Sequence, residues 1–335
     1  MTTKNHRETL STLVHAMFQP QRCERDDVEL HHADQKSGRI LQRMRPQLLQ
    51  TIWSALISAA VMSAAVTSGA SVVEPWSPSG ISSDLNESHA AFDRMTRDVY
   101  FVRSSKTVSG WRILRTHCTH GQWETPVDAP FAGAGLEADP YFTPDGESVY
   151  FISTRATGSN QSKDLDIWRA NRAVDGHWLA PERLPSPVNS DEAEWFPRPS
   201  VDGWLYFGSN RSGGIGKNDI WRAREEKSGQ WRVENLGPNV NTIEDEYEPT
   251  LSPDGRRLII ATTEGIYESH QSKGGWTPRI KMDSGIFNGT ELGVIYSPSG
   301  RSLLFGRDTG ESKSLKLFVW HIRGYEHWPP TCGAH

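Results

Sequence analysis

The sequence predicts an all-β fold, a single β-propeller of four-stranded antiparallel blades. Three observations support this fold class: a hairpin pattern recurs about every 50 residues, a tryptophan follows each hairpin at a similar distance, and turn-forming residues are abundant. The chain has 335 residues, among them 13 Trp, 29 Gly and 20 Pro. This composition suits many short strands and turns better than a helical bundle.

The hairpin is clearest in residues 137–155, "EADPYFTPDGESVYFISTR", and again in residues 246–263, "EYEPTLSPDGRRLIIATT". In each copy an alternating apolar run leads into Asp-Gly and a second run leads out. Asp-Gly between such runs is a strong hairpin signal, because tight turns need a positive φ. We therefore expect two adjacent antiparallel strands in each copy.

Aligning the turns and counting eight residues back gives one glutamate per copy, separated by 50, 57, 52 and 45 residues: Glu87, Glu137, Glu194, Glu246 and Glu291. Such periods indicate a repeat architecture. The first copy lacks the Pro-Asp-Gly turn, and the last has serine in place of aspartate. Five copies occupy residues 87–328, so we expect five blades, with six as the alternative.

Two more strands are predicted in each copy, which gives the four strands of a propeller blade. The third strand is marked by Leu114, Trp168, Trp221, Tyr267 and Trp320. The fourth is predicted at a tryptophan in each copy: Trp123, Trp178, Trp231, Trp276 and Trp328. We interpret these aromatic residues as packing between blades rather than as a sugar-binding platform.

Closure of the ring is left open by the sequence. Trp76 precedes Glu87 at nearly the distance at which an outer-strand tryptophan precedes the next repeat. Residues 72–78 therefore either complete the last blade or lie over the first one. A disulfide between Cys118 and Cys332 is not expected, because a fourth strand at Trp328 would carry Cys332 to the opposite face from Cys118, about 16 Å away, far beyond disulfide reach.

The N-terminal part is predicted to be a targeting region. Residues 52–66, "IWSALISAAVMSAAV", form an apolar run too short for a typical membrane span, and Ser68 and Ala70 provide the small residues of a cleavage site. We expect a polar extension at 1–43 that is not translated if Met44 is the true start, a signal peptide at 44–70 and the propeller at 71–335. The protein would then be periplasmic or secreted, with no membrane span after cleavage; the alternative is an uncleaved anchor.

Charge argues against nucleic acid as a partner. The chain carries 36 Lys and Arg against 41 Asp and Glu, a net charge of −5, and phosphate backbones are bound by clustered basic faces. We expect a monomer that binds a protein or glycan.

The repeated glutamates are predicted at the upper end of the channel, defined here as the end at which the first strand of each repeat begins. Arg103, Arg155, Arg211 and Arg307 fall opposite or beside four of them, so we expect one ion pair per blade. The fourth repeat has Thr263 there, with Glu264 next to it. Glu246 and Glu248 are therefore the acids predicted to be free for a ligand or a divalent cation, with Glu137, Asp139 and Glu194 as neighbours.

Polar, glycine-rich loops are predicted on the same upper face, and we place Lys163, Asp164, Lys217 and Asn218 in the candidate site. Enzyme signatures such as Gly-x-Ser-x-Gly or His-Glu-x-x-His do not occur. "THCTH", with His117, Cys118 and His120, is a weak metal motif because neighbouring residues of a strand point to opposite faces. We expect no catalytic residues and no cofactor, apart from the alternative of a divalent cation at the channel mouth.

Residues 187–223, "PVNSDEAEWFPRPSVDGWLYFGSNRSGGIGKNDIWRA", and residues 239–255, "NVNTIEDEYEPTLSPDG", resemble the repeats of TolB-like β-propellers. The resemblance implies an exported bacterial binding or scaffold protein of the cell envelope that is not an enzyme. The alternative is a metal-dependent propeller lyase or hydrolase acting on carbohydrate, with Glu246, Glu248 and His89 as ligands.

Overall fold

The computed structural model describes residues 73–156, 164–282, 285–287, 289–310 and 314–333. The predicted extension and signal peptide, and Lys163, lie outside these residues. Within the described chain no helix is long and apolar enough to cross a membrane.

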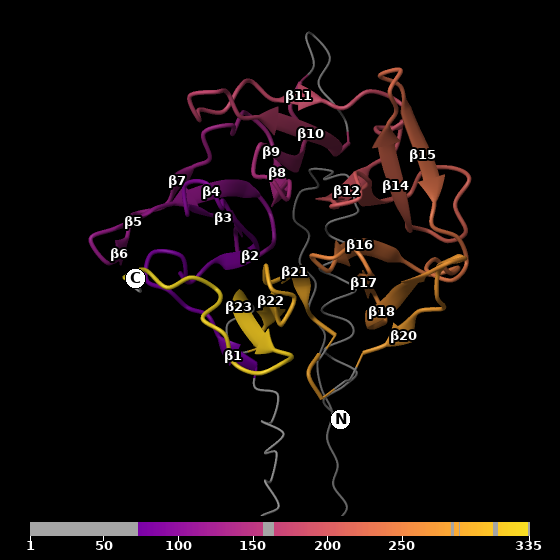
Figure 1. Ribbon diagram of the computed structural model, residues 1–335. Coiled ribbons are helices and arrows are strands. Elements are labelled where there is room, and N and C mark those ends of the chain that lie inside the picture. Colours follow the sequence, from indigo (N-terminus) through magenta and orange to yellow (C-terminus); the bar gives the residue numbers. More distant parts are fainter. Residues whose placement is uncertain (1–72, 157–163, 283–284, 288, 311–313, 334–335) are drawn as a thin grey trace, which may run out of the picture. The chain divides into compact units, whose positions relative to one another are not determined.

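Five antiparallel sheets form a five-bladed β-propeller, which confirms the predicted fold class and blade number (Figure 1). Blade one contains β2 (Asn86–Phe92), β3 (Val99–Ser104), β4 (Arg112–Thr116) and β7 (Val127–Asp128), with the small hairpin β5 (Cys118–Thr119) and β6 (Gln122–Trp123) beside it. Blade two contains β8 (Glu137–Phe142), β9 (Ser148–Ser153), β10 (Asp166–Asn171) and β11 (Glu182–Arg183). Blade three contains β12 (Glu194–Pro199), β13 (Leu205–Ser209), β14 (Asp219–Glu225) and β15 (Trp231–Asn235).

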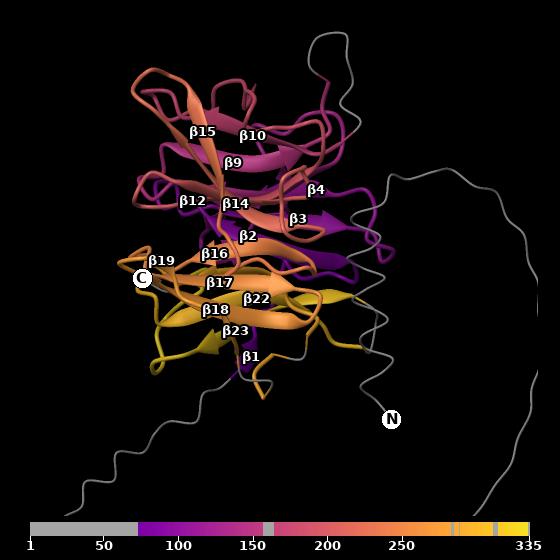
Figure 2. The same ribbon diagram turned by 90° about the vertical axis from the view of Figure 1, so that its right-hand side faces the viewer.

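Blade four contains β16 (Glu246–Leu251), β17 (Arg257–Thr262) and β18 (Gly265–Ser272), and β18 pairs with both β19 (Gly275–Trp276) and β20 (Ile280–Lys281). Blade five contains β21 (Leu292–Tyr296), β22 (Ser302–Asp308), β23 (Leu315–His321) and, from the other end of the chain, β1 (Val73–Pro75). The first strand of each blade lies at the centre and the last at the periphery, as Figure 1 shows, and Figure 2 shows the blades from the side.

The inner hairpins form where Asp-Gly predicted them, but their register is displaced. Glu137 pairs with Ser153 and Glu194 with Ser209, one and two residues from the expected positions. The reason is a bulge in the inner strand of every blade, which leaves residues without a cross-strand partner. A count that assumes a regular hairpin cannot detect this insertion.

The core consists of apolar residues between neighbouring blades, including buried Phe101, Phe151, Phe207 and Phe305 from the second strands. The third-strand residues lie on β4, β10, β14, β18 and β23, as predicted. The fourth-strand prediction is wrong in blades one and two. There Trp123 lies on the small β5–β6 hairpin and Trp178 makes only an isolated bridge to Arg172, while the fourth strands β7 and β11 follow them.

The ring closes through β1, which pairs antiparallel with β23 so that Val73 lies opposite Trp320. Of the two alternatives for residues 72–78, the structure thus selects completion of the last blade. Trp328 therefore lies on no fourth strand, contrary to the prediction. Each first strand runs from the upper to the lower end, the second returns and the third descends again, so the chain after β23 stays at the lower end.

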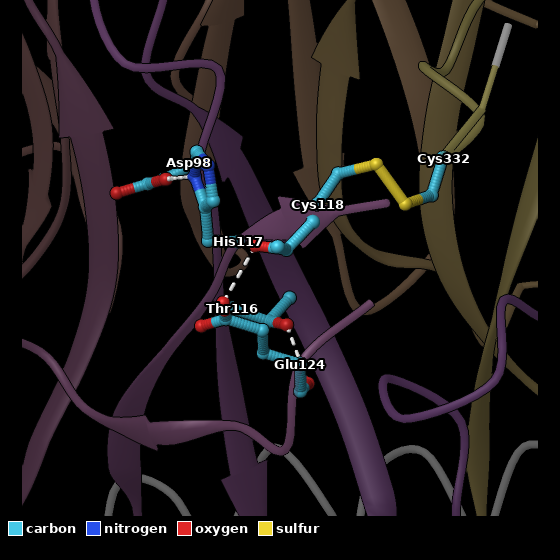
Figure 3. The surroundings of a disulfide bond; sticks show 7 residues. Asp98, Thr116, His117, Cys118, Glu124 and Cys332 are labelled. Atoms are coloured by element: carbon cyan, nitrogen blue, oxygen red, sulfur yellow. Dashed lines mark hydrogen bonds and ion pairs between the residues drawn. A yellow bond between two sulfur atoms is a disulfide. The ribbon is translucent and has the colours of Figure 1, made fainter. Parts of the chain in front are cut away.

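The expectation about the cysteines is consequently wrong: Cys118 and Cys332 form a disulfide, with Cα atoms 5.4 Å apart. Figure 3 shows the bond between the blade-one hairpin and the C-terminal segment. Cys118 follows the descending β4, and Cys332 follows the descending β23, so both lie at the lower end. The sequence argument failed because it assigned Trp328 to an ascending strand that the chain does not form.

Candidate functional site

The upper end of the channel is closed by one buried acid–arginine pair in each blade. Each glutamate side chain is at most 2% exposed. The paired arginines are Arg103 (3.2 Å from Glu87), Arg155 (on Glu137), Arg211 (2.7 Å from Glu194), Arg279 (2.6 Å from Glu246) and Arg307 (2.9 Å from Glu291). The four pairs predicted from the sequence are confirmed. A ring of unpaired acids does not exist here.

These pairs also hold the loops that link the blades. In blade three, Glu194 accepts hydrogen bonds from the backbone N–H of Ser190, at 3.1 Å, and from the Ser209 hydroxyl, at 3.0 Å. Arg211 donates to the backbone carbonyl of Pro187 at 2.7 Å. Burying a charged pair is tolerable only when such extra hydrogen bonds satisfy it. The repeated glutamates are therefore explained by the architecture of the blade.

Blade four follows the same plan with an arginine from another place in the sequence. Arg279, between β19 and β20, reaches Glu246 and also donates to the carbonyl of Val240 at 3.3 Å. The prediction that Glu246 has no basic partner side chain is wrong, because it considered only residues on the partner strand of the hairpin. Glu248 is also paired: its Oε1 accepts from Arg198 at 2.9 Å.

Below these pairs a buried polar cluster crosses the channel. It consists of His89, Asp139, Arg198 and Glu248, each at most 4% exposed, from the inner strands of blades one to four. The Nε2 atom of His89 lies 3.4 Å from Asp139 Oδ1 and 4.0 Å from Glu248 Oε2. Within the described chain this Nε2 makes no hydrogen bond, and neither does Arg198 Nε. The cluster thus retains two unsatisfied nitrogen atoms in a buried position.

The bulges direct these side chains into the channel. Two positions after the repeated glutamate, His89, Asp139 and Phe196 adopt left-handed backbone angles, with φ of 47°, 57° and 51°. Non-glycine residues adopt this conformation at an energetic cost and often near functional sites. Blade five has Gly293 there, and a Cβ on it would lie 2.6 Å from the backbone nitrogen of His89. Glycine is therefore needed for the two strands to approach.

Burial changes the protonation of the cluster. Burial, assisted by Arg198, lowers the pKa of His89 to about 3, so its imidazole is neutral at pH 7. Burial also raises the pKa of Asp139 to about 8, although Arg198 acts in the opposite direction. The pKa of Glu248 is raised by burial as well, again against Arg198. At neutral pH the cluster therefore holds a proton on Asp139 and a neutral imidazole on His89, and Arg198 donates a hydrogen bond to Glu248.

The cluster does not have the arrangement of a metal site. Among the described residues, no group of three or more His, Cys, Asp or Glu is placed to hold a metal ion. The Arg198 guanidinium binds one of the two acids nearest to His89, and its positive charge disfavours a cation there. In the weak motif, Cys118 is in the disulfide and His117 contacts Asp98 instead of a second ligand.

A cavity of about 530 Å³ lies at the lower end of the channel, opposite to the end at which the sequence predicts the site. All five inner hairpins line it, together with one residue from the C-terminal segment. Its walls are formed mainly by Ala91, Phe92, Tyr141, Phe142, Pro199, Leu251, Ile295, Tyr296 and Trp328. The volume is within the range of sites for small ligands or for anchoring side chains.

The mouth of the cavity consists of the residue seven positions after each repeated glutamate: Arg94, Pro144, Val201, Pro253 and Pro298. All five are exposed. Few polar groups are available inside. The Ser200 hydroxyl, in a residue that is 9% exposed, makes no hydrogen bond within the described chain. The cavity is therefore a mostly apolar pocket whose rim consists of three prolines, Val201 and one charged residue, Arg94.

The remaining predicted residues do not meet at one point. Glu137 and Glu194 are in the ion pairs, and Asp139 and Glu248 are in the channel cluster. Lys217 is 67% exposed and lies 3.6 Å from Asp245, to which Asn218 donates at 2.7 Å. Asp164 is partly buried and has an interaction of its own. The cavity residues were missed, although a comparison of the copies four to seven positions after each glutamate would have shown where they differ.

No protein-family model and no curated protein matches the chain. Solved structures that resemble it include TolB from Acinetobacter baumannii, with 17% identity, a TM-score of 0.43 and coverage of 74% of this chain. The chain spans 57% of the length of that TolB. An α-L-arabinofuranosidase from Lactobacillus brevis has 12% identity and a TM-score of 0.47, covering 71% of this chain and 90% of its own. An oligogalacturonate lyase from Vibrio parahaemolyticus has 11% identity and a TM-score of 0.39, covering 72% and 67%.

Proposed function

We propose that the chain is an exported, non-enzymatic binding protein that holds an apolar part of a cell-envelope protein in the lower cavity. The observation that carries this proposal is the cavity itself, to which all five blades contribute and whose residues differ from blade to blade. Protein partners typically insert a few large side chains into such desolvated pockets, and these anchors supply most of the binding energy.

The lining favours a protein anchor over a glycan. Each sugar unit presents several hydroxyl groups, and every one that is buried without a hydrogen-bond partner costs about 1–3 kcal/mol. Three prolines at the mouth have no backbone N–H to donate, and Phe92, Tyr141 and Trp328 present half-buried rings. An aromatic or aliphatic side chain needs no such partners and gains from leaving water.

The surroundings of the mouth extend this apolar surface. Val201 at the rim is 56% exposed, and Met95, in the blade-one turn, is 57% exposed and packs beside the Gly146 turn of blade two. Exposed apolar residues around a pocket are typical of interaction sites. The lower face therefore provides both an anchor pocket and a surrounding contact area.

The alternative function, a metal-dependent lyase or hydrolase, depends on the channel cluster. Its protonated Asp139 and neutral His89 have the shifted pKa values that occur in active sites. Both groups are at most 4% exposed, however, so a polysaccharide cannot reach them without rearrangement. Metal analysis of the purified protein with assays on uronic-acid polymers tests this alternative.

Site-specific cross-linking tests the binding proposal. A photoreactive amino acid is placed at position 201 on the lower rim and, in a matched protein, at position 215 in an upper loop, where Ile215 is 42% exposed. Both proteins are irradiated in envelope extract. We expect one discrete cross-linked partner from position 201 and none from position 215.

Purified partner then allows the affinity to be measured. Val201→Asp should weaken binding about tenfold, because a charge would be buried at the rim, whereas Ile215→Asp should change it less than about twofold. The opposite ranking would move the site to the upper face, where Lys217 and Asn218 lie. Equal, weak cross-linking from both positions would reject a defined docking surface.

A further inference from the structure

The C-terminal segment after β23 supplies one wall of the cavity. We call residues 322–333 the strap. Trp328 in the strap is the only residue among those lining the cavity in the described chain that does not come from an inner hairpin. Its ring packs edge-to-face on Phe92, with centroids 5.6 Å apart, and Phe92 packs on Trp76 at 5.8 Å. The side chain is half buried, so part of its ring is left for a ligand.

Two attachments bracket Trp328. Two residues before it, Glu326 accepts a hydrogen bond from the Ser299 hydroxyl at 2.5 Å and lies 3.5 Å from Arg301, which is 47% exposed. Four residues after it, Cys332 is bonded to Cys118. Between Glu326 and Cys332 the strap forms no strand. The Glu326 side chain is only 10% exposed, so both attachments fix this part of the strap, but the disulfide is the one that can be broken without replacing a residue.

The disulfide joins the strap to a different blade from the one it leaves. The strap follows the third strand of blade five, while Cys118 belongs to the β5–β6 hairpin of blade one. Close approach of the two segments is also seen at Gly333, where a Cβ would lie 3.4 Å from Gly121 Cα. The bond therefore draws the strap across the junction of the two blades, to where Trp328 meets Phe92 from blade one.

We propose that Trp328 is a specificity-determining residue of the cavity, which selects an aromatic or branched aliphatic side chain of the partner, and that the Cys118–Cys332 bond positions it. This inference rests on the proposed function of the lower cavity. The ring of Trp328 is the largest of the half-buried rings in the wall, beside those of Phe92 and Tyr141, and such a surface favours a side chain that can stack or pack on it. The Trp328 ring is therefore the reason to expect an aromatic or branched aliphatic side chain as the ligand.

Fluorescence titration with 1-anilinonaphthalene-8-sulfonate, an aromatic apolar probe, tests the proposal on the whole chain. Trp328→Ala should raise the dissociation constant about tenfold, and Trp328→Phe should restore it to within about threefold, because a smaller ring still packs. Tyr325→Ala is the matched control. Tyr325 is in the same strap and 66% exposed but does not line the cavity, so its loss should change the constant less than about twofold.

The disulfide is tested by reducing the folded wild-type protein at 25 °C and by Cys118→Ser with Cys332→Ser. Reduced protein with an unchanged far-UV spectrum should bind the probe about fivefold more weakly, and reduction should have no further effect on Trp328→Ala, since the wall is already absent. Reduction of the folded protein keeps the test valid if the double serine variant does not fold. Unchanged binding after reduction would overturn the positioning role of the bond.

The outcomes separate this inference from the proposed function. If position 201 cross-links the partner and Val201→Asp weakens partner binding, but Trp328→Ala binds the probe like wild type, the docking surface stands and the role of Trp328 is overturned. If wild-type protein does not bind the probe, both the pocket and the strap proposals are overturned. Equal losses from Trp328→Ala and Tyr325→Ala would show a general effect of the strap on folding and would also reject specificity at Trp328.

Discussion

The two ends of the central channel are built by the same five hairpins, but the blades resemble one another at the upper end and differ at the lower end. At the upper end every blade places a buried glutamate against an arginine. At the lower end the corresponding positions carry arginine, proline or valine at the mouth and alanine, tyrosine or isoleucine inside.

This difference separates what the fold requires from what a ligand would require. A residue that recurs in all blades has a structural role that recurs, such as holding the loop that links two blades. A single ligand in the channel meets five different walls and can be recognised only by residues that are not repeated. The channel cluster and the cavity both consist of such unrepeated residues, whereas the sequence prediction followed the repeated acids and placed the site at the upper end.

The largest expected effect tests whether blade four truly follows the common plan. Arg279→Ala should destabilise the fold by about 3–5 kcal/mol, the same as Arg211→Ala, because each leaves a buried glutamate without its cation. Urea denaturation followed by tryptophan fluorescence measures both. The exposed Arg256 serves as control, and its alanine variant should stay within about 0.5 kcal/mol of wild type.

A much smaller loss for Arg279→Ala than for Arg211→Ala would mean that the two pairs are not equivalent. The five acid–arginine pairs would then share their geometry, but the pair in blade four would contribute less to the free energy of unfolding than the pair in blade three.

The next effect concerns the disulfide bond at the lower end. Replacing both Cys118 and Cys332 with serine should lower the stability by about 2–4 kcal/mol, because the bond closes a long loop in the unfolded chain. Thermal unfolding of the variant, compared with oxidised and reduced wild type, measures the change. A variant as stable as the oxidised protein would show that strap contacts alone hold the lower end together.

The channel cluster predicts a decline of stability between pH 6.5 and 8.5. The pKa of Asp139 is raised to about 8 in the folded protein, so between about pH 4 and about pH 8 the folded state keeps a proton that the unfolded state has released, and this contribution lowers stability as pH rises. His89, with its pKa lowered to about 3, makes the opposite contribution between about pH 3 and 6.5, so the two largely cancel there and the decline due to Asp139 appears above pH 6.5. Above 6.5 its contribution is constant.

Asp139→Asn removes the titrating group and should flatten most of the decline, leaving the share of Glu248, whose pKa is also raised. Melting temperatures in a series of buffers give the two profiles. A variant whose profile parallels that of wild type would show that Asp139 is ionised in the folded protein.

The smallest expected effect compares two equivalent serines at the cavity. Ser252 donates to Asp254 at 2.5 Å and accepts from the backbone N–H of Arg257 at 2.9 Å, so Ser252→Ala should cost about 1 kcal/mol. Ser200 has the same position in blade three but makes no side-chain hydrogen bond in the described chain, so Ser200→Ala should be neutral or slightly stabilising. Equal costs in urea denaturation would contradict this assignment.

Much of the blade could be predicted from the sequence, because its signals are local. Each inner hairpin contains an Asp-Gly or related turn, two alternating apolar runs and, in four blades, an arginine at the end of the second strand. These features lie within about 20 residues of one another, so hairpin geometry relates them directly. The predictions that proved wrong concern contacts between residues that are far apart in the sequence. Arg279 reaches Glu246 across 33 residues and an intervening strand pair. The disulfide joins residues 214 apart through a strap that matches no repeat.

The cavity could not be derived for a related reason. Its volume depends on how far the bulges turn the inner strands and on side chains from five blades at once, and no single stretch of sequence contains that information. The register shift at each bulge also exchanges which residues face the channel. His89, for example, is predicted from the sequence only as a ligand of the alternative metal site, whereas the bulge places it against Asp139.

The pairing of β1 with β23 also sets the order in which the molecule can be completed. Val73 and Trp320 are adjacent in the sheet although 247 residues separate them in the chain. A chain emerging from a ribosome or a translocation pore can form the hairpins of blades one to four as they appear, but the partner of β1 is made last. Until then two strand edges stay unpaired, so the interval before closure is when this protein is most exposed to aggregation and most dependent on chaperones.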